Sequence, residues 1–134
     1  MTQEEKNLLL KDLCVRLPYG LKVDKCNHIH ELQSTLKCGI VLISDIITNK
    51  RITTDIENIR PYLFPLSSLT AKQKQELWAM GWVYLFGVLS NERVAFRTHF
   101  DCRDLIDWLN KNHFDYRGLI EKGLAIDCTN LNIY

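Results

Sequence analysis

The residues best suited to chemistry in this sequence are Cys26, His28 and His30, which stand at alternate positions. On a β-strand such residues point to one face, so the three side chains would share one side of the strand. Cys38 would complete a set of two cysteines and two histidines, which zinc accepts. Structural zinc sites, however, place their ligands as C-x₂₋₄-C and H-x₃₋₅-H on tight turns, and the spacing here differs. We therefore interpret the segment as a polar strand edge and expect no metal or other cofactor. Cys26, His28, His30 and Cys38 remain the candidate ligands.

Two further patterns raise the question of catalysis. Cys102 is predicted to lie in the first turn of a helix near His99, a setting that favours a reactive thiolate. His99 with Asp101, and His113 with Asp115, have the His-x-Asp spacing that could orient an imidazole for acid–base work. Helix capping explains both aspartates better, and the sequence contains neither a G-x-S-x-G elbow nor a P-loop lysine. We assign no catalytic residue.

Basic and aromatic side chains mix in the last third of the chain. The candidate partner-binding residues there are Trp108, Tyr116 and Arg117. Such mixtures stack on single-stranded bases or anchor protein partners. Trp108 also stands at helical spacing from Leu105, which favours a position in the core.

The first part of the chain predicts a helix over residues 2–17. Thr2 and Glu5 form a capping box, leucines then recur at helical spacing, and Pro18 with Gly20 ends the helix.

Residues 21–60 are predicted to be rich in β-structure. They alternate loosely between apolar and polar types, and residues 38–47 are rich in Ile and Val ahead of a polar turn at 48–51. Several short strands with tight links indicate a small antiparallel sheet or a partly closed barrel.

The second half of the chain is divided by prolines and helix caps. Pro61 and Pro65 forbid a regular helix between them, Thr70 opens a second capping box, and Asp101 and Asp115 are candidate N-caps. We expect an extended connector over 60–69, a helix over 70–80, a hairpin or an extension of that helix over 82–99, and a mostly helical part over 101–125.

Composition restricts the class of protein. The chain has 134 residues, of which 46% are hydrophobic and 25% charged, so it predicts one globular domain over residues 1–134 and excludes disordered, collagen-like and coiled-coil chains. Lys and Arg number 17 against 16 Asp and Glu, for a net charge of +1. Dedicated duplex-DNA binders usually carry a clear basic excess.

The cysteines and the apolar segments bear on the compartment. The sequence contains five cysteines, an odd number, and no CxxC pair. Its start is acidic, where a signal peptide would be basic, and its longest apolar run, at 82–89, is far shorter than the roughly 20 residues of a membrane span. We expect a cytoplasmic protein with reduced thiols.

Three blocks of the sequence, residues 9–20, 60–70 and 107–125, resemble a family of small proteins with no assigned activity. The family is encoded in the genomes of anaerobic gut bacteria, in prophages or mobile elements. The resemblance implies a bacterial, intracellular and phage-derived context, and it carries no catalytic residue, cofactor or mechanism.

The expected architecture is therefore a single α+β domain. Its N-terminal helix covers a small antiparallel sheet or partly closed barrel, and its C-terminal part is mostly helical. The leading functional hypothesis is a non-enzymatic binding or adaptor module with a protein partner. The alternative is a nucleic-acid-associated accessory factor that uses a face of the barrel, and the weakest hypothesis is an enzyme with an unrecognised site. We expect no membrane partner.

Overall fold

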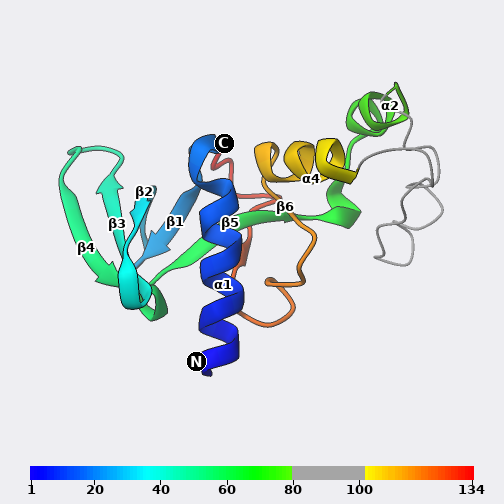
Figure 1. The fold of residues 1–134 in the computed structure, drawn as a ribbon. Coiled ribbons are helices and arrows are strands. Elements are labelled where there is room, and N and C mark those ends of the chain that lie inside the picture. Colours follow the sequence, from blue (N-terminus) through cyan, green and yellow to red (C-terminus); the bar gives the residue numbers. More distant parts are fainter. Residues whose placement is uncertain (80–101) are drawn as a thin grey trace.

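The structure is a computed structural model that describes residues 1–79 and 102–134 (Figure 1). The helices are α1 (Gln3–Arg16), α2 (Ala71–Ala79) and α4 (Cys102–Lys111). The strands are β1 (Lys22–Lys25), β2 (His28–Thr35), β3 (Ile40–Asp45), β4 (Arg51–Asp55), β5 (Arg60–Pro65), β6 (Phe114–Asp115) and β7 (Ile126–Asp127). The hairpin or helix extension predicted over 82–99 lies outside the described residues, and so does Asp101.

Helix α1 begins and ends as its sequence predicts. The Thr2 hydroxyl oxygen accepts a hydrogen bond from the Glu5 amide at 3.1 Å, and the Thr2 amide donates to the Glu5 carboxylate at 2.7 Å. These two bonds satisfy amides that a helix start otherwise leaves unpaired. After Arg16 the chain makes one 3₁₀ turn and leaves through Gly20, whose φ of +66° suits glycine. The predicted helix over 2–17 is confirmed.

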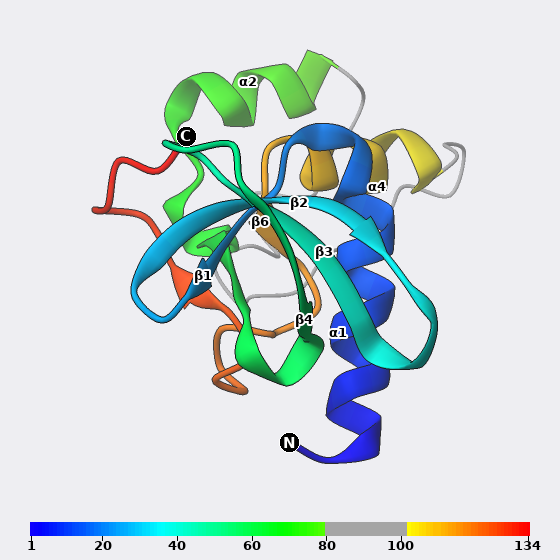
Figure 2. The same ribbon diagram turned by 90° about the vertical axis from the view of Figure 1, so that its left-hand side faces the viewer.

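Strands β1 to β5 form an antiparallel sheet, in the order β4-β3-β2-β1-β5. The short strands β6 and β7 both lie parallel to β5, so the whole sheet is mixed. A bulge between Leu32 and Ser34 interrupts the pairing of β2 with β3, and Figure 2 shows how strongly these strands curve. The predicted α+β class is confirmed, and the antiparallel sheet is confirmed for β1 to β5 only. The sheet is not closed into a barrel, because β4 pairs with β3 alone in the described part of the chain.

The segment predicted as an extended connector over 60–69 is strand β5, followed by a 3₁₀ turn at Leu66–Ser68. Its prolines hold the backbone at extended angles, which a strand shares with a connector. Neighbours for β5 come from distant sequence: the Phe64 amide donates to the His113 carbonyl at 2.8 Å, and the Cys128 amide donates to the Leu63 carbonyl at 3.0 Å. The connector prediction was right about extension and wrong about the element. The next helix, predicted over 70–80, is observed as α2, and Thr70 and Gln73 exchange both capping-box bonds.

The prediction of a mostly helical part over 101–125 is wrong, because among its described residues only α4 is helical. The chain leaves α4 through His113 at a φ of +62° and then forms β6 and a series of turns. Asp115 does cap amides, as predicted, but they are those of a turn: its carboxylate accepts from the amides of Arg117, Leu119 and Ile120. Gly118, with a φ of +72°, lies inside that turn and prevents a regular helix.

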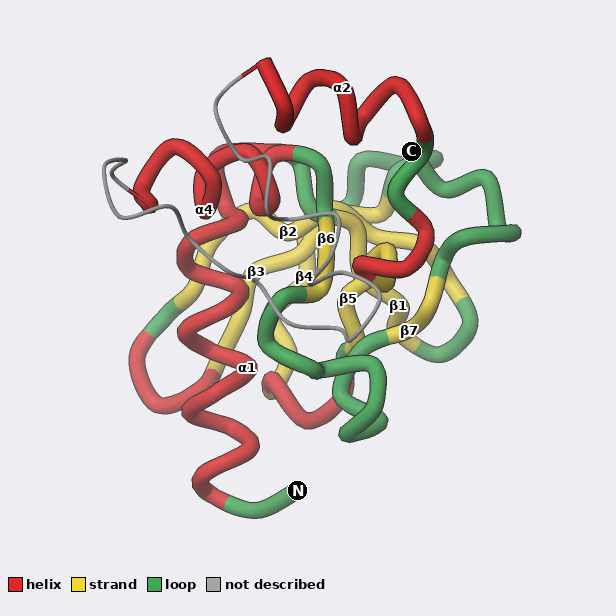
Figure 3. The backbone as a smooth tube through the Cα atoms, turned by 90° about the vertical axis from the view of Figure 1, so that its right-hand side faces the viewer, coloured by secondary structure: helices red, strands yellow, loops and turns green. Residues whose placement is uncertain are grey.

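Two apolar clusters stabilise the fold. The larger lies between α1 and the concave face of the sheet and includes Leu9, Leu13, Val23, Ile43 and Leu63. Figure 3 shows α1 in front of the strands on that side. The smaller joins α2, α4 and β6 through Leu66, Leu69, Leu77, Leu105, Leu109 and Phe114. No helix in residues 1–79 or 102–134 has the length and apolar content that a membrane crossing requires.

Candidate interaction surface

The four candidate metal ligands do not converge. Cys26 lies in the β1–β2 turn with a φ of +54°, so it does not share a strand face with the two histidines. His28 is exposed at the start of β2, whereas His30 is buried, with its Nδ1 3.0 Å from the His28 carbonyl and its Nε2 4.0 Å from Asp45. Cys38 lies beyond the opposite end of β2. Among the described residues no three His, Cys, Asp or Glu side chains are grouped to hold a metal ion.

The His113–Asp115 spacing does not produce an acid–base pair. The Asp115 carboxylate accepts hydrogen bonds from backbone amides, while the His113 ring stacks on the Tyr134 ring with centroids 3.8 Å apart. Burial, reinforced by the positive charges of Arg16 and Lys22, lowers the pKa of His113 to about 4. The imidazole is therefore neutral near physiological pH and buried away from solvent. His99, and the side chain of Cys102, lie outside the described part of the chain.

The three candidate partner-binding residues are each half-buried and contact neighbours within the chain. Trp108 stacks on Phe114 with ring centroids 5.6 Å apart. The Tyr116 hydroxyl donates to the Asn110 amide oxygen at 2.9 Å. Arg117 lies beside Tyr116, with its guanidinium 5.0 Å from the ring centroid. Trp108, Tyr116 and Arg117 thus lie half-buried at the junction of α4 and β6.

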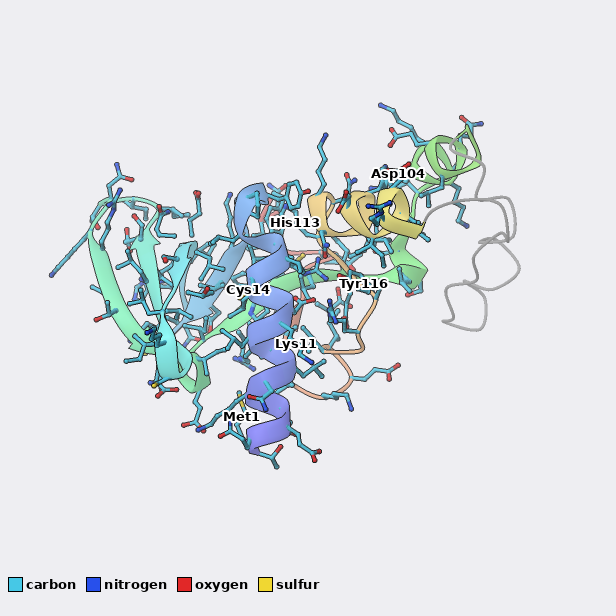
Figure 4. The ribbon with its side chains drawn as sticks, in the orientation of Figure 1. Met1, Lys11, Cys14, Asp104, His113 and Tyr116 are labelled. Carbon is cyan, nitrogen blue, oxygen red and sulfur yellow. The ribbon has the colours of Figure 1, made fainter. Side chains whose placement is uncertain are left out.

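A buried ion pair organises this junction. Arg16 donates from Nε to one Asp12 carboxylate oxygen at 2.7 Å and from Nη2 to the other at 3.1 Å. The same Nη2 donates to the Phe114 carbonyl at 2.6 Å, and the guanidinium lies 5.4 Å from the Tyr116 ring centroid. Arg117 Nε lies 3.3 Å from Asp12. The pair therefore ties α1 to the C-terminal segment, and Figure 4 shows His113 and Tyr116 on the side of α1 that carries α4.

A hollow of about 290 Å³ opens next to Tyr116. It is lined by Pro65, Leu66, Asp115, Tyr116, Gly118, Ile120 and Glu121. Its size is at the lower limit for small-molecule sites. The Asp115 carboxylate accepts hydrogen bonds from backbone amides, so Glu121 is the carboxylate of this lining that remains for a ligand. The lining lacks the several convergent polar groups that fix a ligand's orientation.

The clearest surface feature is the turn between β3 and β4, where two adjacent isoleucines face solvent. Ile47 is 88% exposed and Ile46 42% exposed. The turn is held rigid by Asp45, whose carboxylate accepts from the amides of Ile47 at 2.9 Å and Thr48 at 2.8 Å. Those backbone hydrogen bonds lower the pKa of the Asp45 carboxyl group. Asn49 closes the turn at a φ of +56°, and its backbone amide donates a hydrogen bond to the Asp45 carbonyl.

Two β-branched apolar residues at the tip of such a turn break the usual rule for turn composition. Turns favour Gly, Asn, Asp and Ser, which tolerate the backbone angles and remain well solvated. Departures from local rules without a packing gain are expected at functional positions. The sequence contains this signal, although the prediction put Ile46 and Ile47 at the end of the apolar segment 38–47. The chain in fact turns at Asp45.

Next to this turn, strand β4 is the edge strand of the sheet among residues 1–79 and 102–134, and it is the outermost strand at the left of Figure 1. Its two ends differ in charge. Lys50 and Arg51 are basic and exposed at its start, while Asp55 and Glu57 are acidic and exposed at and just after its end. Glu57 also pairs with Lys6 of α1 at 2.7 Å.

Comparisons with protein-family models, with curated proteins and with solved structures each give no match to this chain.

Proposed function

We propose that this protein is a non-enzymatic binding module that contacts a protein partner through the β3–β4 turn. The observation that carries the proposal is the 88% exposure of Ile47 on a turn that Asp45 holds in place. Ile46 and Ile47 act as adjacent apolar anchors. The chemistry of the partner surface follows: an apolar socket for the isoleucines, with acidic groups near Lys50 and Arg51.

The energetics favour such a contact. Fully burying an isoleucine side chain contributes about 1.5–3 kcal/mol, and in most protein interfaces a few buried residues supply most of the binding energy. Two hydrogen bonds from backbone amides to the Asp45 carboxylate already fix the turn. Binding a partner therefore costs little conformational entropy for ordering this loop.

The alternative function is nucleic-acid binding through the sheet. It has less support than a protein partner, because the basic side chains near β1 contact other groups of the chain. Lys22 donates from Nζ to the Ile133 carbonyl at 2.9 Å, and Arg60 lies 3.7 Å from Asp24. These cations are engaged within the chain. A steep salt dependence of nucleic-acid binding would favour the alternative.

The cellular context belongs to the same proposal. The resemblance of residues 9–20, 60–70 and 107–125 suggests a bacterial protein of phage or mobile-element origin that works in the cytoplasm. Four cysteines of the described residues, Cys14, Cys26, Cys38 and Cys128, are free thiols, which fits a reducing compartment.

Site-specific photo-crosslinking in the native host tests the proposal. A photoreactive residue replaces Ile47 in one variant and, as the matched control, Leu131 in another, since Leu131 is also apolar and exposed. We expect a discrete protein adduct from position 47 that is absent from position 131. The purified adduct partner should bind wild-type protein at least tenfold more tightly than the Ile47→Ser variant. Equal adduct patterns from the two positions would overturn the proposal.

A further inference from the structure

We infer that the partner of this surface is a second copy of the same chain, joined to the first through β4 in an antiparallel, two-fold arrangement. The inference rests on the proposed function and names its partner. Three properties of this edge of the sheet lead to it: the backbone groups of β4 that point away from β3, the distribution of charge along the strand, and the positions of the exposed apolar residues near its two ends.

The backbone of β4 is prepared for another strand. The Asp45 amide donates to the Lys50 carbonyl at 2.9 Å, which makes these residues a hydrogen-bonded pair. Hydrogen-bonded and non-bonded pairs alternate along an antiparallel ladder. By that alternation Arg51, Thr53 and Asp55 direct their amide and carbonyl groups away from β3, toward the open edge.

The charges of β4 are complementary to themselves in one orientation. In an antiparallel pair centred on Thr53, Arg51 of each copy stands opposite Asp55 of the other, and Ile52 stands opposite Thr54. Arg51, Thr53 and Asp55 are all exposed and share the outer face of the sheet, so the two-fold axis produces the same favourable ion pair twice. A parallel pair in register would place Arg51 against Arg51, which opposes association.

The same two-fold axis accounts for the exposed apolar residues. In Figure 1 the β3–β4 turn lies at the top of β4, and the 3₁₀ turn at Ile56–Asn58 lies at its bottom. Antiparallel pairing therefore brings Ile46 and Ile47 of one copy to the bottom end of the other. That end exposes Leu36 and Ile40, and it borders a hollow of about 340 Å³ between α1, the β2–β3 link and Ile56.

Strand β4 lacks three of the devices that commonly block a sheet edge, namely a bulge, a proline and an inward-facing charge. The β3–β4 register is regular, with no bulge, and the strand contains no proline and no inward-facing charge. Its charges stand at the two ends, where they discourage pairing with an unrelated strand and match a second copy.

Analytical ultracentrifugation of the full chain over a wide concentration range tests the inference. The wild type should show a reversible monomer–dimer equilibrium. Arg51→Glu and Asp55→Arg should each raise the dimer dissociation constant at least tenfold, because each creates two like-charge contacts. The double variant Arg51→Glu/Asp55→Arg should recover most of the lost affinity, since it restores both ion pairs in reverse. Lys11→Glu, which reverses an exposed charge on α1, is the matched control and should dimerise as the wild type does. Circular dichroism of each variant confirms that it is folded.

A wild type that stays monomeric throughout, or a dimer that both single reversals leave intact, would overturn the inference. The outcome also separates the two proposals. If the protein is monomeric but a photoreactive residue at position 47 captures a different protein, the proposed function stands and self-association fails. If the protein is monomeric and position 47 gives no specific adduct, both fail.

Discussion

Arg16 and Asp12 face one another one helical turn apart on α1, and both side chains are fully buried. Two hydrogen bonds join them, at 2.7 Å and 3.1 Å, and a third runs from Arg16 to the Phe114 carbonyl. Through this pair the N-terminal helix α1 contacts the C-terminal segment at Phe114. It therefore couples the sheet-bearing half of the molecule to the half that contains α4.

Replacing Asp12 with alanine should destabilise the protein by about 3–5 kcal/mol, because it leaves the buried guanidinium of Arg16 without its counter-charge. Urea unfolding monitored by circular dichroism measures the change. Asp107→Ala removes an exposed carboxylate from α4 and should shift stability by less than about 0.5 kcal/mol. A cost for Asp12→Ala no larger than that of Asp107→Ala would mean that the pair does not hold the two halves together.

Stability should fall in mild acid because of His113. Its pKa is lowered from the ordinary value of 6.5 to about 4 in the folded chain. Above the ordinary value both states are neutral and the full stability is present. Between the ordinary pKa of 6.5 and the folded-state pKa of about 4, the imidazole is protonated in the unfolded chain but stays neutral in the folded chain. The free energy of unfolding therefore decreases as the pH falls, by up to about 3 kcal/mol in total.

His113→Phe provides the control, because it keeps an aromatic ring against Tyr134 and removes the titrating group. The loss of unfolding free energy between about pH 7 and about pH 5 should shrink in this variant, as the linkage relation requires. Replacing the exposed His28 with phenylalanine should leave the loss unchanged. If wild type and His113→Phe lose stability in parallel, His113 is not the group responsible.

The aromatic stack between α4 and β6 should be structural. Phe114 is almost completely buried, so Phe114→Ala should cost about 3–5 kcal/mol and lower the melting temperature by roughly 10 °C or more. Trp108 is half-buried against it, and its truncation should cost less. Thermal melts of both variants, with Val15→Ala at an exposed site as the control, test this. If Phe114→Ala melts at the same temperature as the wild type, Phe114 and Trp108 are not part of the core.

The thiols should react with a colorimetric thiol reagent in two classes. Cys14, Cys26 and Cys38 are exposed and should react quickly in the folded protein. Burial, with the nearby Asp127 carboxylate, raises the pKa of the Cys128 thiol to about 11, so Cys128 should react only when the chain unfolds. All five cysteines should react in denaturant without reductant, because we expect no disulfide. Finding three or fewer would show a native disulfide bridge.

Local sequence signals predicted the local elements well. The capping boxes at Thr2 and Thr70 located the starts of α1 and α2, because a cap depends on residues three positions apart. The same locality explains the errors. Whether the proline-flanked segment at 60–65 is a connector or a strand depends on β1, β6 and β7, which lie far away in sequence.

The candidate sites were harder to predict for the same reason. Residue type alone suggested Tyr116 and Arg117 as a binding pair. Only the fold shows that Tyr116 is hydrogen-bonded to Asn110 and that Arg117 lies beside Asp12. Exposure is likewise a three-dimensional property. Ile46 and Ile47 read as the end of a buried strand until the position of the turn at Asp45 is known.

Amide hydrogen exchange along β4, measured by NMR as the protein concentration is raised, shows whether a second copy covers this edge of the sheet. The amides of Arg51, Thr53 and Asp55 point away from β3 and should exchange quickly in dilute protein. Their exchange should slow as the concentration rises, because a second copy then covers the edge. The amides of Ile52 and Thr54, which face β3, serve as the internal control and should change little. Rates for Arg51, Thr53 and Asp55 that stay fast and independent of concentration would rule out pairing through β4.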